Sequence, residues 1–238
     1  MIRFRADLHV HTVLSPCAGR DMLPKQIVAS ALFHEINLIA ITDHNASQNA
    51  AAVIEVAEAE GLLVLPGMEL ETMEEIHALC LFESLSQLQA LQEVVDKNLP
   101  NRPNNEEILG PQTIVNADGN VLAKEARMLL APVQISIQSA CQIVTDLGGW
   151  FIPAHVNREA FGLLPRLGSV PPDLKVEFLE LTRNADEALL IKKYPQLTHY
   201  HLIKNGDVHY LDEFLGSAIF SAEDSSLAAI RTGLLSIA

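Results

Sequence analysis

Arg5-Ala6-Asp7-Leu8-His9-Val10-His11-Thr12 stands near the amino end of the chain and alternates apolar with polar residues. This alternation is typical of a β-strand, in which every second side chain points to the same face. Asp7, His9 and His11 are therefore expected to share one face, with both imidazoles directed the same way. The stretch predicts a strand whose carboxyl end carries reactive side chains.

Short apolar runs alternate with helical segments along most of the remaining chain. The later strands are predicted at Leu38–Thr42, Leu62–Leu65, Ile76–Phe82, Trp150–His155, Leu174–Leu181, Tyr200–His209 and Ser217–Phe220. The helices are predicted at Pro24–Glu35, Ala46–Glu60, Leu85–Leu99, Ile137–Leu147, Asp186–Lys193 and Leu227–Leu235. This order is typical of parallel sheets covered by helices, and six to eight parallel strands without a repeat favour a closed or nearly closed α/β barrel.

Residues 100–132 interrupt this rhythm. Asparagine, proline and glycine residues between Asn101 and Pro111 mark a loop. Ile114-Val115 and Val121-Leu122 then flank the turn Asp118-Gly119, as in a small hairpin. We therefore expect a single domain over residues 1–238, with a small loop and hairpin insertion at residues 100–132.

The composition restricts the classes of function. Hydrophobic residues make up 49% of the 238 positions and charged residues 19%, which excludes a disordered or coiled-coil protein. Lys+Arg 16 against Asp+Glu 30 gives a net charge of −14. We expect this overall field to repel long nucleic acid and anionic membranes.

Two further features suggest the compartment. The N-terminus has no apolar signal segment, and no apolar run approaches the roughly 20 residues that cross a bilayer. Cys17, Cys80 and Cys141 form no CxxC pair, so neither a disulfide framework nor a zinc ribbon fits. We expect a soluble protein of the reducing cytoplasm.

Histidines and carboxylates gather where the predicted strands end, which is where barrel enzymes place reactive groups. They are His9, His11, Asp43, His44, Glu69, His77, His155, Asp207 and His209. Imidazole and carboxylate are ligands of zinc, manganese and iron, and eight or nine of them are too many for one tetrahedral ion. The pattern predicts two or three divalent ions and hydrolytic chemistry.

Five motifs in this order resemble those of the polymerase and histidinol phosphatase (PHP) superfamily. They are Asp7-Leu8-His9-Val10-His11-Thr12, Ile41-Thr42-Asp43-His44-Asn45, Gly67-Met68-Glu69 with His77 downstream, Pro153-Ala154-His155, and Gly206-Asp207-Val208-His209. The resemblance runs from residue 7 to residue 209 and implies a distorted (β/α)7 TIM-like barrel around a cleft with two or three metal ions. By position, His9, His11, Glu69, Asp207 and His209 look like ligands of the central metals, and His44, His77 and His155 complete the neighbouring sites.

One position differs from the family pattern. Many relatives place a histidine or aspartate five or six residues after the second histidine of the first motif, where this chain has Ser15-Pro16-Cys17 and, further on, Asp21. Two alternatives remain open: Cys17 binds a metal as a thiolate, or Asp21 turns inward in its place.

Several residues are assigned supporting roles. Asp7 and Asp43 precede ligand histidines, and we interpret them as acceptors that orient imidazoles. Arg158 and Arg20 are candidates for binding a substrate phosphate. His155, His209 or a metal-bound water is the candidate general acid for the leaving group.

These observations predict a metal-dependent phosphoesterase that hydrolyses a small phosphomonoester through a metal-bridging hydroxide. The expected partner is a small phosphorylated substrate rather than long nucleic acid, and the oligomeric state stays open. Two alternatives are a metal-binding regulatory module without turnover and an amidohydrolase-like enzyme.

Overall fold

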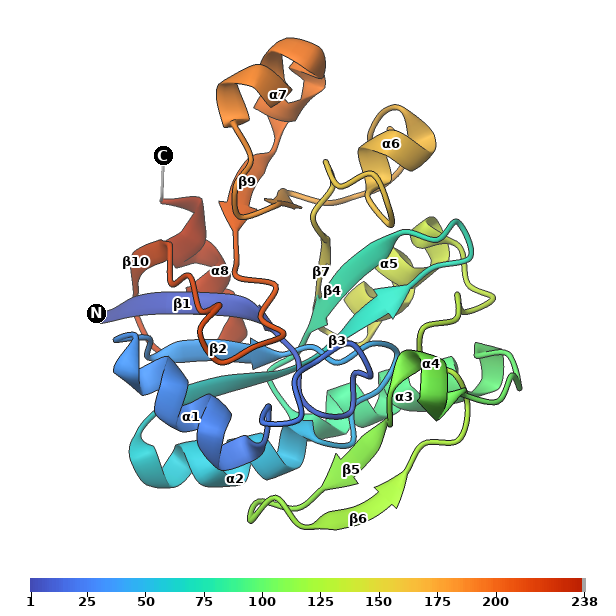
Figure 1. Cartoon of the computed structure of the whole chain (residues 1–238). Helices are drawn as coiled ribbons and strands as arrows, with labels where there is room; N and C mark the ends of the chain where they lie inside the picture. Colours follow the sequence, from blue (N-terminus) through green and yellow to red (C-terminus); the bar gives the residue numbers. More distant parts are fainter. Residues whose placement is uncertain (237–238) are drawn as a thin grey trace.

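A curled six-stranded sheet forms the centre of the computed structural model, which describes residues 1–236 (Figure 1). Its strand order is β10 (Ala218–Ala222), β1 (Ile2–Val10), β2 (Leu38–Ile41), β3 (Leu63–Glu71), β4 (His77–Leu81) and β7 (Trp150–Pro153). β1, β2 and β3 pair in parallel, whereas β10, β4 and β7 join the sheet antiparallel. The sheet is a half-barrel within an α/β fold.

The expectation of an all-parallel barrel is therefore wrong in part. Residues 72–76 join β3 to β4 directly, and so short a connection can only return antiparallel, because a parallel crossover needs a dozen or more residues. A full (β/α)7 ring of paired strands is not what the described residues form. The coarser expectation of an α/β half-barrel with helices around it holds.

A separate parallel pair, β8 (Phe178–Leu181) and β9 (His201–Lys204), lies between the ends of β7 and β1. On the β7 side, Val156 N donates to Glu180 O at 2.8 Å. On the β1 side, a parallel bridge joins Val208, which follows β9, to Val10, with His11 N donating to Val208 O and Val208 N donating to His9 O, both at 2.9 Å. β9 is shorter than the predicted strand Tyr200–His209, because Asp207 has a left-handed φ of 50° that a strand does not accommodate. Residues 205–217 form a loop instead.

Helices cover both faces of the sheet (Figure 1). One apolar cluster packs α1 (Pro24–Phe33), α2 (Ala50–Glu60), α3 (Leu85–Asn98) and α5 (Ile137–Asp146) against the sheet. A second cluster packs α8 (Leu227–Leu235) and Phe178 against Leu8, Leu79 and Trp150. The strand ends between these clusters are held rigidly, which positions the polar residues that follow them.

The remaining elements are short. α4 (Glu106–Leu109) precedes the antiparallel hairpin of β5 (Thr113–Val115) and β6 (Val121–Lys124), within residues 100–132. Thr113 N donates to Val13 O at 3.0 Å and ties this hairpin to the loop after β1. α6 (Leu163–Leu167), α7 (Glu187–Lys193) and the 3-10 helix Pro195–His199 lie near β7 to β9. Among the described residues, no helix combines the length and the apolar character needed to span a bilayer.

Candidate metal centre

Glu69 lies at the middle of a cluster of five imidazoles. Its Oε2 is 3.3 Å from His9 Nε2, 3.3 Å from His11 Nε2 and 3.0 Å from His44 Nδ1. Its Oε1 is 2.8 Å from His77 Nδ1 and 3.0 Å from His155 Nε2. The carboxylate and all five imidazoles are buried. One carboxylate thus contacts five histidines, which come from four of the five sequence motifs.

The backbone explains how these side chains meet. β3 carries Glu69 between β2 and β4, and Gly67 permits this close packing, because a Cβ there would lie 2.9 Å from Leu81 Cδ2 and 3.1 Å from Ile41 O. His155 follows β7 and has a positive φ of 30°, which turns the chain sharply at the strand end. Such strained conformations persist where the surrounding structure enforces them, and they cluster at functional sites.

Asp207 approaches the cluster from the loop after β9. Its Oδ1 is 3.2 Å from His9 Nε2 and 3.5 Å from His11 Nε2, and its Oδ2 is 3.3 Å from Arg158 Nη1. The rings of His11 and His209 stack with their centroids 4.1 Å apart. The sequence-predicted ligand residues of the last motif therefore lie against those of the first.

Unpaired polar atoms show that this centre could bind cations. Among residues 1–236, seven of its buried atoms have no hydrogen-bond partner: His9 Nε2, His11 Nε2, His44 Nδ1, Glu69 Oε2, His77 Nε2, His155 Nδ1 and Asp207 Oδ1. A buried polar atom left unpaired is rare in a native protein because it loses its hydration without compensation. Divalent ions bound by nitrogen and oxygen would satisfy the atoms of those residues that also form donor sets, which are all of them except His155. The residues present therefore fit a metal centre.

The donor atoms form three overlapping sets, in each of which the atoms lie within 4.8 Å of one another. The sets are His9, His11, Glu69 and Asp207; His44, Glu69 and His77; and His11, His44 and His209. Glu69, His11 and His44 each belong to two sets. Shared ligands of this kind are what a centre with neighbouring ions requires.

The charge state of the centre follows from Glu69. Burial favours its neutral form, but the charges of His77, His9 and His44 outweigh burial and hold the pKa of this carboxyl well below its usual range. Burial likewise opposes charge on His11 and His77, yet the carboxylates beside them raise the pKa of each imidazole to about 9. His209 differs, because burial and the neighbouring His11 lower its pKa to about 3. Burial opposes charge on His9 as well, yet Glu180, Asp207 and Glu69 hold its pKa well above the usual value. Without metal, the centre therefore holds protons on His9, His11 and His77 at neutral pH.

We expect the affinity of the centre for zinc to rise between pH 6 and pH 9. A metal binds neutral imidazole, so it must displace the protons that His11 and His77 hold below a pKa of about 9. Each displaced proton makes the apparent affinity rise about tenfold per pH unit, and the rise ends above that pKa. Titration calorimetry in buffers of different ionisation enthalpy measures both the affinity and the proton release. An affinity that is flat from pH 7 to pH 9 would contradict this charge state.

Asp43 and Asp7 support the centre in different ways. Asp43 Oδ1 accepts from Ser15 Oγ at 2.6 Å, and Ser15 Oγ lies 2.9 Å from His11 Nδ1, so Asp43 orients an imidazole through a serine. Asp7 instead accepts the backbone N–H groups of Gly206 and Leu215 at 2.8 and 2.9 Å. Burial raises the pKa of Asp7 to about 6. Asp7 thus holds the loop that carries Asp207, a role that differs from the predicted orientation of an imidazole.

A cavity of about 490 Å³ opens beside the centre, lined by Cys17, His155, Arg158, Asp207 and His209 among others. Cys17 is exposed there. Burial opposes charge on His44, but Glu69 and Cys17 beside it raise the pKa of this imidazole. Asp21 is exposed on the same loop. The donor sets found among the described residues contain neither Cys17 nor Asp21, so the assignment of this ligand position stays a prediction.

The two arginines predicted to bind phosphate lie in different places. Arg158 lines the cavity beside Asp207 and His209. Arg20 lines a second cavity of about 630 Å³ between the loop after β1 and the hairpin β5–β6. Of the two, Arg158 is therefore the one placed at the centre.

Sequence reasoning missed Glu180, a buried carboxylate on β8 whose Oε2 lies 3.0 Å from His9 Nδ1. It also missed Asn205, which donates to Glu180 Oε1 at 2.7 Å. A signal was present, because Glu180 interrupts the apolar run Phe178-Leu179-Glu180-Leu181 near the end of a predicted strand. An acidic residue in such a run needs a buried partner.

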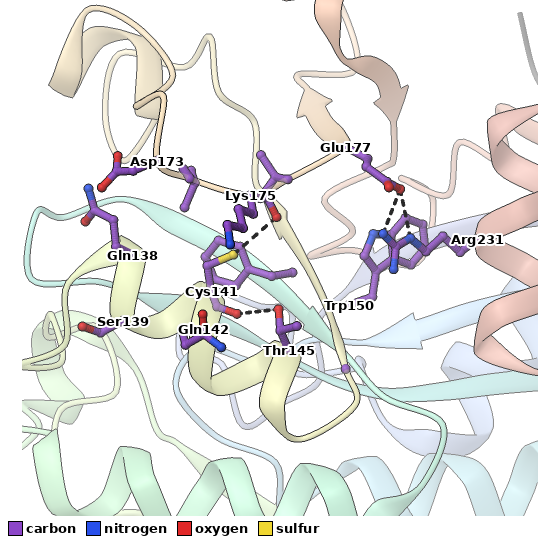
Figure 2. A pocket seen from close by; sticks show the side chains of 14 residues that line it. Gln138, Ser139, Cys141, Gln142, Thr145, Trp150, Asp173, Lys175, Glu177 and Arg231 are labelled. Carbon is purple, nitrogen blue, oxygen red and sulfur yellow. Dashed lines mark hydrogen bonds and ion pairs between the residues drawn. The ribbon is translucent and has the colours of Figure 1, made fainter.

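A further cavity of about 420 Å³ lies between α5, residues 173–177 and the start of β7 (Figure 2). Lys175 and Arg231 contribute cations to its lining, and Arg231 Nη2 pairs with Glu177 at 2.8 Å. Trp150 at this cavity begins β7, whereas His155 follows the other end of the strand. The cavity is therefore separate from the metal centre.

The half-barrel fold carries a buried histidine–carboxylate centre whose donor atoms fit divalent metal ions. The PHP domain family model matches residues 7–152, which is more than half of the chain, and the chain belongs to this family. No curated protein sequence matches this chain.

Solved structures with the same fold include the lesion-specific endonuclease EndoQ from Pyrococcus furiosus. It has a TM-score of 0.74 and 18% identity and covers 100% of this chain, which spans 57% of the EndoQ chain. A complex of Endonuclease Q with a 27-mer duplex that has an abasic lesion at the active site gives a TM-score of 0.73 with the same identity and coverage. A protein assigned as a metal-dependent phosphoesterase from Bifidobacterium adolescentis has a TM-score of 0.62 and 17% identity, covering 97% of this chain and 95% of its own.

The expectation that net charge speaks against long nucleic acid is wrong, because a protein of this fold binds a DNA duplex at its active site. The net charge of −14 is a sum over the whole chain. A phosphate at the active site responds mainly to the charges within about 10 Å, since salt screens the more distant ones. Net charge therefore excludes no phosphate ester, whatever its size.

Proposed function

We propose that the chain is a metal-dependent phosphoesterase whose reaction takes place at the Glu69 centre. The observation that carries the proposal is that six residues of the donor sets, Glu69 among them, each have a buried side-chain atom without a hydrogen-bond partner, among residues 1–236. A cavity of about 490 Å³ with Arg158 at its edge adjoins these atoms. Its size suits a small phosphomonoester, which is the substrate class that we propose first.

A second candidate substrate is a phosphodiester within a nucleic acid. The likeness of fold to EndoQ over the whole of this chain favours it. Tyr210 also lines the cavity and is 52% exposed, so its ring is accessible for stacking with a base. The two candidates use the same centre and differ in what occupies the cavity beyond the phosphate.

We assign two or three divalent ions of zinc, manganese or iron to the three donor sets. His9, His11, Glu69 and Asp207 would hold one ion, His44, Glu69 and His77 a second, and His11, His44 and His209 a third. Bound ions of this kind neutralise phosphoryl oxygens and make hydroxide available near neutral pH.

The protein's own side chains then bind the substrate and move protons. Arg158 is 43% exposed at its side chain and reaches the cavity, where its guanidinium can bind phosphate oxygens in a bidentate manner. His155 also lines the cavity and stands outside the donor sets formed by the described residues, which leaves its imidazole free to carry a proton. We therefore assign protonation of the leaving oxygen to His155 in preference to His209, which belongs to a donor set.

Three cysteines that form no disulfide among the described residues support a reducing compartment such as the cytoplasm. This proposal concerns the location only and does not affect the chemistry.

A substrate panel tests the proposed function. Protein purified without chelator is loaded with zinc, manganese or iron and assayed on a phosphomonoester, a phosphodiester, a carboxylic ester and an amide. Release of phosphate or cleavage of the diester, lost in a His9→Ala, Asp207→Ala double variant, is the expected result. Metal-loaded protein that cleaves only the amide or nothing at all would overturn the proposal.

Arg158→Ala is expected to lower kcat/KM for a phosphate ester by roughly 10-fold to 100-fold, the loss that follows from removing a charged hydrogen bond of about 1.5–3 kcal/mol. The metal content should stay unchanged, because Arg158 contacts Asp207 Oδ2 and not the donor atom Oδ1. Arg183→Ala, on the same cavity, serves for comparison and is expected to have the smaller effect. If kcat/KM of Arg158→Ala stayed within twofold of the value for the original protein, Arg158 would not bind the substrate.

A further inference from the structure

Glu180 is buried at 2% exposure and uses both of its oxygens. Oε2 accepts from the backbone N–H of His155 at 2.9 Å, and Oε1 accepts from Asn205 Nδ2 at 2.7 Å. His9 Nδ1 lies 3.1 Å from Oε1 and 3.0 Å from Oε2. Each oxygen already accepts a hydrogen bond, and the donor sets among the described residues do not contain Glu180, so we treat it as a partner of His9 and not as a metal ligand.

The two nitrogens of His9 face different groups. Nδ1 faces Glu180, whereas Nε2 faces Glu69 Oε2 at 3.3 Å and Asp207 Oδ1 at 3.2 Å. A carboxylate can only accept, so it requires a proton on Nδ1. Nε2 faces the carboxylates of Glu69 and Asp207 and so also carries a proton while no metal is bound. When a metal displaces that proton, Nδ1 keeps its hydrogen and Nε2 presents its lone pair, which is the form of imidazole that binds a metal.

Asn205 holds Glu180 in place. Its Nδ2 donates to Glu180, and its Oδ1 accepts from the backbone N–H of Leu8 in β1 at 2.9 Å. The pair therefore connects the small sheet of β8 and β9 to β1 where no strand ladder does so. It also fixes the backbone of His155 at the end of β7.

We propose that Glu180 is a positioning residue that holds His9 with a proton on Nδ1 and its Nε2 lone pair toward the metal, with Asn205 as its anchor. The proposal rests on the function proposed above. It adds that metal affinity depends on a carboxylate that touches no metal, and that the same carboxylate fixes the backbone of the proposed proton donor.

Glu180→Gln tests the proposal. The amide keeps the size of the side chain but replaces one of the two accepting oxygens by an NH₂ group, which then faces His155 N or Asn205 Nδ2 as donor against donor. It cannot satisfy His9, His155 and Asn205 together. We expect zinc affinity, measured by competition with a chelator, to fall about 10-fold to 100-fold, as for other partners of metal-binding histidines. Long-range ¹⁵N–¹H spectra of the zinc-loaded protein should show the Nδ1 proton of His9 shifted or lost.

Two further variants complete the test. Glu180→Asp keeps the charge and is expected to retain more zinc affinity than Glu180→Gln. Glu177→Gln is the matched control, because Glu177 lies three positions earlier, is half-exposed and pairs with Arg231 away from the centre. It should leave zinc affinity and the His9 signal unchanged.

The outcomes separate this proposal from the proposed function. Unchanged zinc affinity and an unchanged His9 signal in Glu180→Gln would overturn the role of Glu180. An equal loss of zinc in Glu180→Asp, with the His9 signal unaltered in both variants, would also overturn it and leave a structural role. If the original protein cleaves no phosphate ester but zinc affinity still falls with the altered His9 signal, the proposed function fails and the role of Glu180 stands.

Discussion

Glu69→Gln is expected to lower kcat/KM for a phosphate ester by at least about 10³-fold, the upper end of the loss seen when one electrostatic group is removed from an active site. Glu69 contacts five imidazoles and belongs to two of the donor sets formed by residues 1–236. The amide has the same size but no charge, so a change in packing does not explain the loss. Metal content by elemental mass spectrometry should fall together with activity.

Glu75→Gln is the matched control for this change. Glu75 follows β3 on the same hairpin, is half-exposed, and pairs with Arg166. Its kcat/KM and metal content should equal those of the original protein. If Glu69→Gln retained more than a tenth of the activity with its full metal content, the reaction would not take place at this centre.

The second large effect concerns stability. Zinc at about 100 times its Kd should stabilise the fold by about 2.7 kcal/mol for each independent ion. At about 2–4 °C per kcal/mol for a chain of this length, one ion is expected to raise Tm by about 5–11 °C relative to protein in chelator. The physical reason is that buried atoms such as His9 Nε2 and Glu69 Oε2 lack partners among the described residues until a cation binds. Differential scanning calorimetry measures the shift.

The His9→Ala, Asp207→Ala double variant provides the control, because it removes two ligands from the four-residue donor set. Its Tm should rise less with zinc than that of the original protein. An equal shift in both proteins would mean that zinc stabilises the fold from another place. A shift of less than 1 °C in the original protein would contradict a metal centre at Glu69.

Local patterns predicted the helices well and the sheet less well. α3 begins where Ser84 and Gln87 form a capping box, a signal that is read from four consecutive residues. The direction of β4 was not predicted in this way. An apolar run such as Ile76–Phe82 looks the same in a parallel and an antiparallel strand, and the pairing with β3 and β7 depends on segments far away in the chain.

The residue pattern was sufficient to indicate the family and to point to the histidines and carboxylates that the fold brings together. Imidazoles and carboxylates that follow apolar runs are local features, and the motifs at residues 7–12, 41–45, 67–69 and 206–209 carry them in the printed order. The pattern could not predict the arrangement of these residues in space. Glu69 lies at the middle of five histidines, Asp7 accepts hydrogen bonds from the loop that carries Asp207, and Glu180 contacts His9 Nδ1. These contacts join residues as far apart as 171 and 199 positions. Pairs so distant in sequence meet only because the sheet curls and the small β8–β9 sheet lies between β7 and β1, and no local pattern encodes that geometry.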